Sequence, residues 1–104
     1  MEWTARCWVG GRVLEVELEA TRDLLSALAA AGLVLRSACR NGLCGLCKCR
    51  LLAGAVDYAG REPHALWSRE RAAGFILPCI ARPRGDLLLA GLPLAGGPAA
   101  GGLI

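Results

Sequence analysis

The stretch that decides the fold is Cys39-Arg40-Asn41-Gly42-Leu43-Cys44-Gly45-Leu46-Cys47, which places three cysteines within one short run. A fourth cysteine, Cys79, stands 32 positions after Cys47. Thiolates are metal ligands, and three of them so close together force the backbone to wrap around whatever they hold. Gly42 and Gly45 suit such a loop because glycine accepts positive φ and lets backbone N–H groups approach sulfur. The rest of the chain is then the scaffold that positions these thiols.

The spacing C-x4-C-x2-C, followed by a distant cysteine, is the pattern that ligates plant-type 2Fe–2S clusters. Such a cluster carries one electron at a time, so the spacing predicts an electron carrier. We expect the cluster ligands to be Cys39, Cys44, Cys47 and Cys79. The six cysteines also raise the question of disulfides. The N-terminal residues show no apolar run typical of a signal peptide, so we expect a cytoplasmic chain in which metal binding is preferred.

The composition limits the number of domains and the kinds of partner that the chain can have. A chain of 104 residues predicts one domain, and a hydrophobic content of 55% is enough for one small core. The net charge of +3 is too modest to indicate a nucleic-acid partner. Glycines and prolines interrupt the uncharged run over residues 87–104, so we expect no membrane association. We also expect a monomer, with one domain over residues 1–90 and a mobile Gly/Pro/Ala-rich tail over residues 91–104.

The N-terminal third predicts a hairpin followed by a helix. Two strands, over residues 3–9 and 12–19, flank Gly10-Gly11, a turn that tolerates positive φ. The second strand alternates, with Leu14, Val16 and Leu18 on one side and glutamates on the other. A helix then follows, with Thr21 as its N-cap and Gly32 just past its end.

The remaining elements are shorter. Strands are expected over residues 48–53 and 86–89, a short helix over residues 64–73, and irregular chain over residues 74–79. The order is hairpin, helix, loop, strand, short helix and strand. It predicts an α+β fold in which one main helix packs across a small mixed sheet.

The run Ser37–Lys48 resembles plant-type (chloroplast-type) 2Fe–2S ferredoxins, and within them the bacterial branch associated with oxygenases and ring-cleavage dioxygenases. The segment Gly74–Pro83 is similar to that family's fourth-ligand segment, and Asp86–Leu89 to its closing strand. The resemblance covers about residues 3–90 and implies the β-grasp fold. It also implies that Cys39 and Cys44 hold one iron, and that Cys47 and Cys79 hold the other.

The same resemblance implies a function. The chain would carry single electrons from a flavoprotein reductase to an oxygenase or other metalloenzyme, and would not be an enzyme by itself. An alternative is a ferredoxin that reactivates a catechol-type ring-cleavage dioxygenase by re-reducing its iron. The chain could also be a fragment of a larger reductase, because such reductases carry this domain fused to flavin and nicotinamide domains. A low reduction potential, of about −400 mV, is typical of plant-type clusters.

Other classes of function fit the residues less well. A structural or regulatory β-grasp module would use the cysteines for zinc, but all-cysteine zinc sites usually comprise two close pairs, and Cys79 is isolated. The cluster domain of a molybdenum hydroxylase would need its fourth cysteine much closer to the third.

Residues around the ligands carry further predictions. Cys7 and Cys49 are expected to be small buried hydrophobes, although Cys49 could also be a fifth, exchangeable ligand. Trp67 is expected to pack the short helix. The net positive charge favours a partner with an acidic docking face. We expect Arg40, Lys48 and Arg50 to form the docking rim, rather than the face of Glu15, Glu17 and Glu19.

Overall fold

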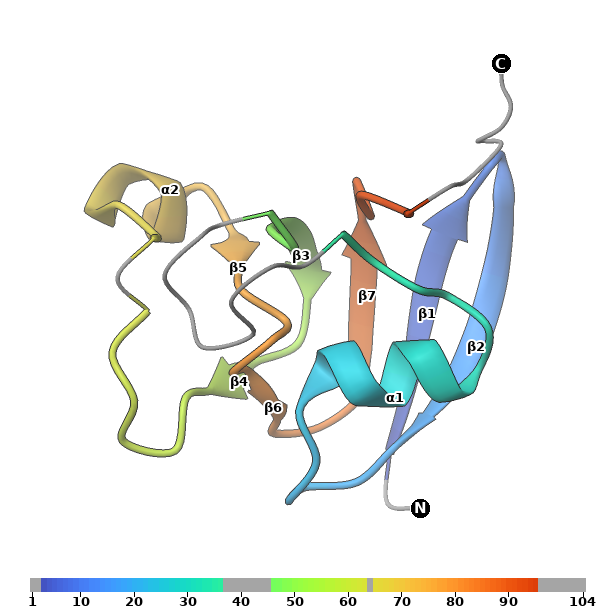
Figure 1. The fold of residues 1–104 in the computed structure, drawn as a ribbon, viewed down its shortest axis with the longest axis horizontal. Helices are drawn as coiled ribbons and strands as arrows, with labels where there is room; N and C mark the ends of the chain where they lie inside the picture. Colours follow the sequence, from blue (N-terminus) through green and yellow to red (C-terminus); the bar gives the residue numbers. More distant parts are fainter. Residues whose placement is uncertain (1–2, 37–45, 64, 96–104) are drawn as a thin grey trace.

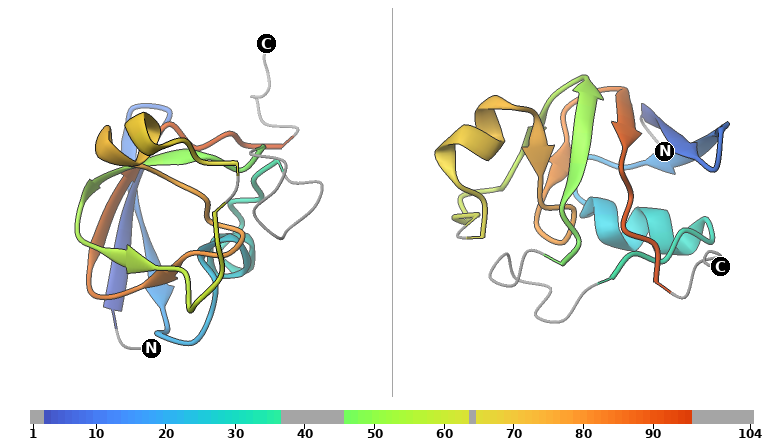
Figure 2. Two further views of the ribbon diagram at one scale, coloured as in Figure 1. Left: turned by 90° about the vertical axis from the view of Figure 1, so that its left-hand side faces the viewer. Right: turned by 90° about the horizontal axis from the view of Figure 1, so that it is seen from above.

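A computed structural model describes residues 3–36, 46–63 and 65–95 of the chain (Figure 1). Its elements confirm the predicted α+β class, with one longer helix lying across a mixed sheet (Figures 1 and 2). In chain order they are β1 (Trp3–Val9), β2 (Arg12–Leu18), α1 (Leu24–Ala30), β3 (Cys49–Ala53), β4 (Val56–Asp57), α2 (Ser68–Ala72), β5 (Phe75–Ile76), β6 (Arg82–Pro83) and β7 (Leu87–Ala90).

The main sheet has the strand order β2-β1-β7-β3-β5. The β1 strand is antiparallel to β2 and parallel to β7, and it pairs Ala5 with Leu87 and Cys7 with Leu89. The β3 strand runs antiparallel to both β7 and β5. The short strands β4 and β6 form a second, two-stranded sheet. Distant parts of the sequence therefore meet at the centre of the main sheet.

The β1–β2 hairpin follows its sequence pattern. Gly10 and Gly11 turn the chain with φ of 57° and 80°, as the prediction of a primed turn requires. Ala5 and Cys7 are buried on the face that α1 covers, and Val16 is buried opposite Ala5. Leu14 departs from the pattern and stays 38% exposed, because β2 is an edge strand and Leu14 lies toward its hairpin end.

The main helix begins later than predicted. Its N-cap is Asp23 and not Thr21: Asp23 Oδ2 accepts a hydrogen bond of 2.8 Å from the Ser26 backbone N–H. The Ser26 hydroxyl also donates to Asp23 Oδ1 at 3.0 Å. A turn, closed by the Arg22 N–H to the Glu19 carbonyl at 3.2 Å, occupies the residues where the prediction started the helix. The helix buries Leu24, Leu25, Ala27 and Leu28.

Three short strands differ from the prediction. The segment 74–79, predicted to be irregular, contains β5, which pairs with β3. The strands β4 and β6 were not predicted, because two residues give no periodicity to detect. The short helix occupies residues 68–72, within the predicted 64–73.

Residues 93–95 of the predicted tail pair with residues 34–36. The Arg36 N–H donates to the Pro93 carbonyl at 2.8 Å, and the Ala95 N–H donates to the Val34 carbonyl at 2.8 Å. Leu92 and Leu94 pack against the core. Residues 96–104 of the predicted tail lie outside the described residues.

Candidate metal centre

The four candidate ligands come from two parts of the chain. Cys39 and Cys44 lie outside the described residues. Cys47 and Cys79 are described, and both are buried, with 1% and 6% of their surface exposed. The β3–β5 pairing joins Cys49 to Ile76, and the same antiparallel register, counted onward, brings Cys47 level with Pro78. The sheet therefore places Cys47 and Cys79 at the same end of these two strands.

Cys79 sits in a turn that α1 holds in place. The Leu24 N–H donates to the Ala81 carbonyl and the Leu25 N–H donates to the Pro78 carbonyl, both at 2.9 Å. These two N–H groups belong to the first turn of α1, where no carbonyl of the helix itself is available. Within the turn, the Ala81 N–H donates to the Leu77 carbonyl at 3.0 Å. The helix and the ligand segment thereby satisfy each other's backbone groups.

Tyr58 also contacts the segment that leads to Cys79. Burial raises the pKa of its phenol, while a hydrogen bond with the Leu77 backbone and the nearby charge of Arg71 act in the opposite direction. The guanidinium of Arg71 lies 5.7 Å from the centre of the Tyr58 ring. The phenol is also close enough to Cys79 for a thiolate there to affect it. Tyr58 thus links α2 to the Cys79 turn.

Lys48, the residue after Cys47, contacts Glu70 of α2. The Lys48 Nζ donates to Glu70 Oε2 at 2.7 Å, and the two side chains are 25% and 29% exposed. The other carboxylate oxygen, Oε1, accepts from the Trp67 N–H at 2.9 Å at the start of α2. These contacts lower the pKa of Glu70, the hydrogen bond from Lys48 first. This pair cannot be read from the sequence, because no local pattern connects residues 22 positions apart.

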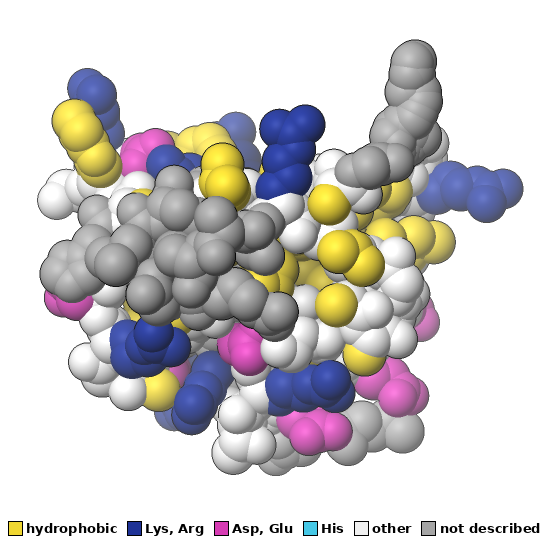
Figure 3. All heavy atoms as spheres, viewed as in Figure 1, with side chains coloured by type: hydrophobic (Ala, Val, Ile, Leu, Met, Phe, Trp, Pro, Cys, Tyr) yellow, Lys and Arg dark blue, Asp and Glu magenta, His cyan; other side chains and the backbone are white. Residues whose placement is uncertain are grey.

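The basic residues predicted near the site lie apart from one another and make different contacts. Arg50 is exposed, and its Nε donates to the Ala73 carbonyl at 3.2 Å while its guanidinium lies 5.7 Å from the Phe75 ring centre. Arg84 is 3.3 Å from Asp57, and Lys48 is committed to Glu70. Arg36 is exposed, Arg82 is half-buried, and Arg40 lies outside the described residues. Figure 3 shows Lys and Arg side chains spread over this face rather than gathered in one patch.

Cys7 and Cys49 are buried in the core, as predicted, with 0% and 1% exposed. Burial raises the pKa of Cys7 to about 11. Burial, with a smaller contribution from Cys7, raises the pKa of Cys49 to about 12. Both are strand residues facing the core, whereas Cys47 and Cys79 lie just beyond the ends of strands.

Trp67 contacts the short helix through Arg69 but is not buried against it. It is 64% exposed and is the N-cap residue of α2. The Arg69 guanidinium lies 5.3 Å from the centre of its ring. Its indole therefore adds an apolar surface at the start of α2.

The described residues fit a cluster held by thiolates. Cys47 and Cys79 are soft sulfur donors, the type of ligand that iron–sulfur clusters require, and they lie among apolar neighbours such as Leu77 and Pro78. Within residues 3–36, 46–63 and 65–95, no group of three His, Cys, Asp or Glu offers a different, complete metal site.

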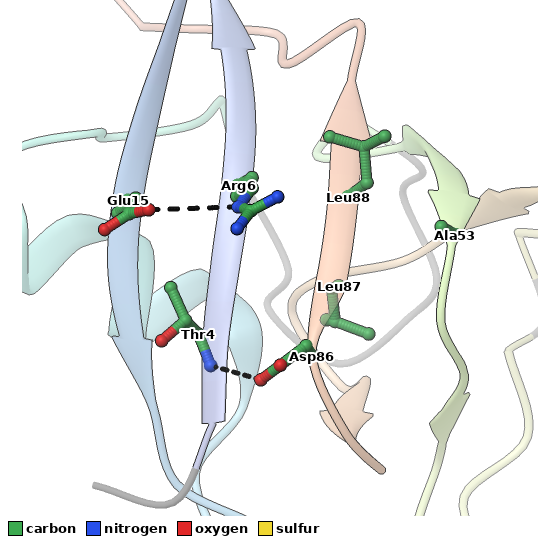
Figure 4. A pocket seen from close by; sticks show the side chains of 7 residues that line it. All are labelled: Thr4, Arg6, Glu15, Ala53, Asp86, Leu87 and Leu88. Atoms are coloured by element: carbon green, nitrogen blue, oxygen red, sulfur yellow. Dashed lines mark hydrogen bonds and ion pairs between the residues drawn. The ribbon is translucent and has the colours of Figure 1, made fainter.

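A groove of about 380 Å³ lies on the face of the sheet opposite α1 (Figure 4). Across it, the Thr4 N–H donates to Asp86 Oδ1 at 2.9 Å, and Arg6 faces Glu15 at 3.8 Å. None of the described candidate ligands lines this groove. Its lining residues are Thr4, Arg6, Glu15, Ala53, Asp86, Leu87 and Leu88.

Among the described helices, none is long and apolar enough to cross a membrane.

Comparison with known proteins gives a consistent result. The family described as 2Fe-2S iron-sulfur cluster binding domain matches residues 9–84. The reductase subunit of an aromatic O-demethylase from Amycolatopsis sp. is 41% identical over 78 residues, which is 75% of this chain and 23% of that protein. An uncharacterized ferredoxin-like protein of Escherichia coli is 42% identical over 65 residues, covering 62% of this chain and 71% of that protein.

Solved structures agree with these relatives. The crystal structure of the Amycolatopsis cytochrome P450 reductase GcoB superimposes with a TM-score of 0.71 at 35% identity, covering 85% of this chain and 25% of that one. The chain spans 20 to 23% of the length of five curated relatives, two of which are named as a reductase subunit or reductase component.

Proposed function

Because the chain belongs to the family of 2Fe–2S iron–sulfur cluster-binding domains, with the plant-type ferredoxin fold, we propose that its cluster is held by four named cysteines. They are Cys39, Cys44, Cys47 and Cys79. The observation that carries this proposal is the burial of Cys47 and Cys79 at one end of the β3–β5 pair, with the family's cysteine spacing around them. Cys7 and Cys49 then act as core residues and not as ligands.

The chain is a one-electron carrier. When bound, a 2Fe–2S cluster supplies one-electron redox chemistry, at about −400 mV in plant-type ferredoxins. The protein's part is to hold the thiols rigidly and to exclude water from them. The hydrogen bonds of α1 to the Cys79 turn do the first, and the burial of Leu77, Pro78 and Ile80 does the second.

We infer that the donor is a flavoprotein reductase module and that the acceptor is an oxygenase. Relatives named as an aromatic O-demethylase reductase subunit and a phenol 2-monooxygenase reductase component support this assignment. The chain corresponds to a fraction of those proteins, so the reductase module is either a separate protein or another part of the same one. In either arrangement this domain acts as a carrier and not as an enzyme by itself. Ligation by thiolates suits a reducing compartment such as the cytoplasm.

The ligand assignment is tested by replacing single cysteines. Anaerobically purified protein should contain iron and sulfide in equal amounts and give a rhombic EPR signal on reduction. Replacement of any proposed ligand by Ala should abolish cluster assembly, because ligand binding and folding are coupled. The matched controls are Cys7→Ala and Cys49→Ala, which should keep the spectrum. A colourless parent protein loaded with zinc, or cluster loss in Cys49→Ala with retention in Cys47→Ala, would contradict the proposal.

A further inference from the structure

Glu70 makes two contacts that join the short helix to the segment entering β3. Its Oε2 accepts from Lys48 Nζ at 2.7 Å, and its Oε1 accepts from the Trp67 N–H at 2.9 Å. The first contact reaches the residue directly after Cys47, and the second fixes the start of α2. Both side chains of the Lys48–Glu70 pair are less than a third exposed, so solvent screens this pair less than a fully exposed one.

We propose that Glu70 is a positioning residue for the cluster, which acts through Lys48 on the backbone that carries Cys47. The proposal rests on the proposed function, in which Cys47 is a ligand. The β3 strand begins two residues after Cys47, and Lys48 lies between the ligand and the strand. A contact that anchors Lys48 therefore limits how far the ligand can move relative to the sheet.

The Cys79 side is held differently, which makes the Glu70 contact separable by mutation. Cys79 is positioned by backbone hydrogen bonds from Leu24 and Leu25 of α1, which no side-chain replacement removes directly. Lys48 is anchored through side chains, on a five-residue helix with no buried residues. Breaking the pair should therefore loosen the Cys47 side while the core and the Cys79 turn persist.

The opposite charges of the pair distinguish positioning from simple electrostatics. If Lys48 and Glu70 acted only as charges, Lys48→Met would lower the reduction potential and Glu70→Gln would raise it, and the double variant would return near the parent value. If the pair positions the ligand, both single variants release the cluster faster than the parent protein. The double variant should then be no worse than either single variant, because the interaction is already lost.

The experiment measures the rate at which an iron chelator removes the cluster from the reconstituted protein, together with visible circular dichroism and the midpoint potential. Lys48→Met and Glu70→Gln should each release the cluster about fivefold faster, the change expected for loss of one partly exposed ion pair. Glu70→Gln keeps an amide oxygen that can still accept from the Trp67 N–H, so it isolates the Lys48 contact. Lys48→Arg should restore a release rate close to that of the parent.

The pair formed by Arg6 and Glu15 is the matched control. These side chains are 67% and 68% exposed, 3.8 Å apart, on strands β1 and β2. Arg6→Met and Glu15→Gln should leave the release rate and the visible circular dichroism unchanged. Should Glu70→Gln fail to fold, Lys48→Met compared with Lys48→Arg carries the same expectation.

The outcomes separate this inference from the proposed function. A parent protein that assembles no cluster contradicts the function itself. A parent protein with a normal cluster, whose Lys48→Met and Glu70→Gln variants keep the parent release rate, overturns the positioning role. Potentials that shift in opposite directions at an unchanged release rate would also overturn it, because the pair would then act only through its charges.

Discussion

The described cysteines of this protein are distinguished by their position and not by their burial. Cys7, Cys47, Cys49 and Cys79 are all at most 6% exposed. Cys7 and Cys49 lie within strands and face the core, where a thiol serves as a small hydrophobe. Cys47 and Cys79, the proposed ligands, lie just outside strands, where the chain is turning.

The thiol of Cys7 should make the folded protein sensitive to alkali. Burial raises its pKa from 9.0 to about 11, so the folded state disfavours the thiolate. Below pH 9 the thiol is neutral in both states and its contribution to stability is complete. As the pH rises from 9 to 11, only the unfolded state ionises, and the contribution is lost.

We therefore expect the parent protein to lose on the order of 2 kcal/mol more stability than Cys7→Ala between pH 8.5 and pH 11. Denaturant unfolding of both proteins at a series of pH values measures this difference. Cys49 is present in both and its burial affects the two curves alike, so that only the smaller contribution of Cys7 to the pKa of Cys49 differs between them. Parallel curves for parent and variant across this range would show that Cys7 is not desolvated.

At the level of elements, the first turn of α1 performs two tasks. Asp23 caps the helix, and the N–H groups of Leu24 and Leu25 hold the carbonyls on either side of Cys79. A change in the cap therefore reaches the cluster site through the backbone of the helix. The two tasks explain why α1, with only seven residues, can anchor the segment that carries the proposed ligand Cys79.

Asp23→Ala should destabilise the protein by about 1 kcal/mol, the usual cost of losing an N-cap side chain. It should also speed cluster release, because the first turn of α1 holds the Cys79 turn. Thr21→Ala is the control, since the structure does not use Thr21 as the cap. Thermal unfolding and chelator release measure the two effects. A larger loss of stability for Thr21→Ala than for Asp23→Ala would show that Thr21 is the N-cap, as the sequence predicts.

Elements that local sequence patterns specify could be predicted, whereas elements that depend on pairing with distant residues could not. The β1–β2 hairpin was predictable, because Gly10-Gly11 and the alternation in β2 are local patterns. The strands β4, β5 and β6 were not, because each has two residues and exists through pairing with a distant partner. The same holds at the site: the cysteine spacing indicates the cluster, but the Lys48–Glu70 contact forms only when α2 folds against β3.

Over the whole molecule, charge indicates where a partner should dock. The predicted rim included Lys48, but Glu70 neutralises it. Arg50 and Arg69 are exposed, and each lies over an aromatic ring beside α2, the helix that is tied to Lys48. Glu15 and Glu17 lie on the hairpin strand β2, at the opposite edge of the sheet from β5.

Reversing Arg50 and Arg69 to Glu should slow electron transfer from the reductase at low ionic strength far more than at high, with an unchanged cluster spectrum. Charges at the rim of an interface mainly change the association rate and its dependence on salt. Stopped-flow reduction over a range of salt concentrations measures this effect. The comparison is Glu15→Arg with Glu17→Arg, which should have little effect. The reverse ranking of the two double variants would place docking on the hairpin side.

The parallel pairing of β1 with β7 also has a consequence for biogenesis. Ala5 pairs with Leu87, and Cys79 precedes β7 by only a few residues. During synthesis the first three proposed ligands leave the ribosome while the central strand of their sheet has not yet been made. Stable cluster binding should therefore follow synthesis of β7, which comes after all four proposed ligands. A chain truncated before β7 should therefore fail to hold a cluster, because its sheet lacks the central strand.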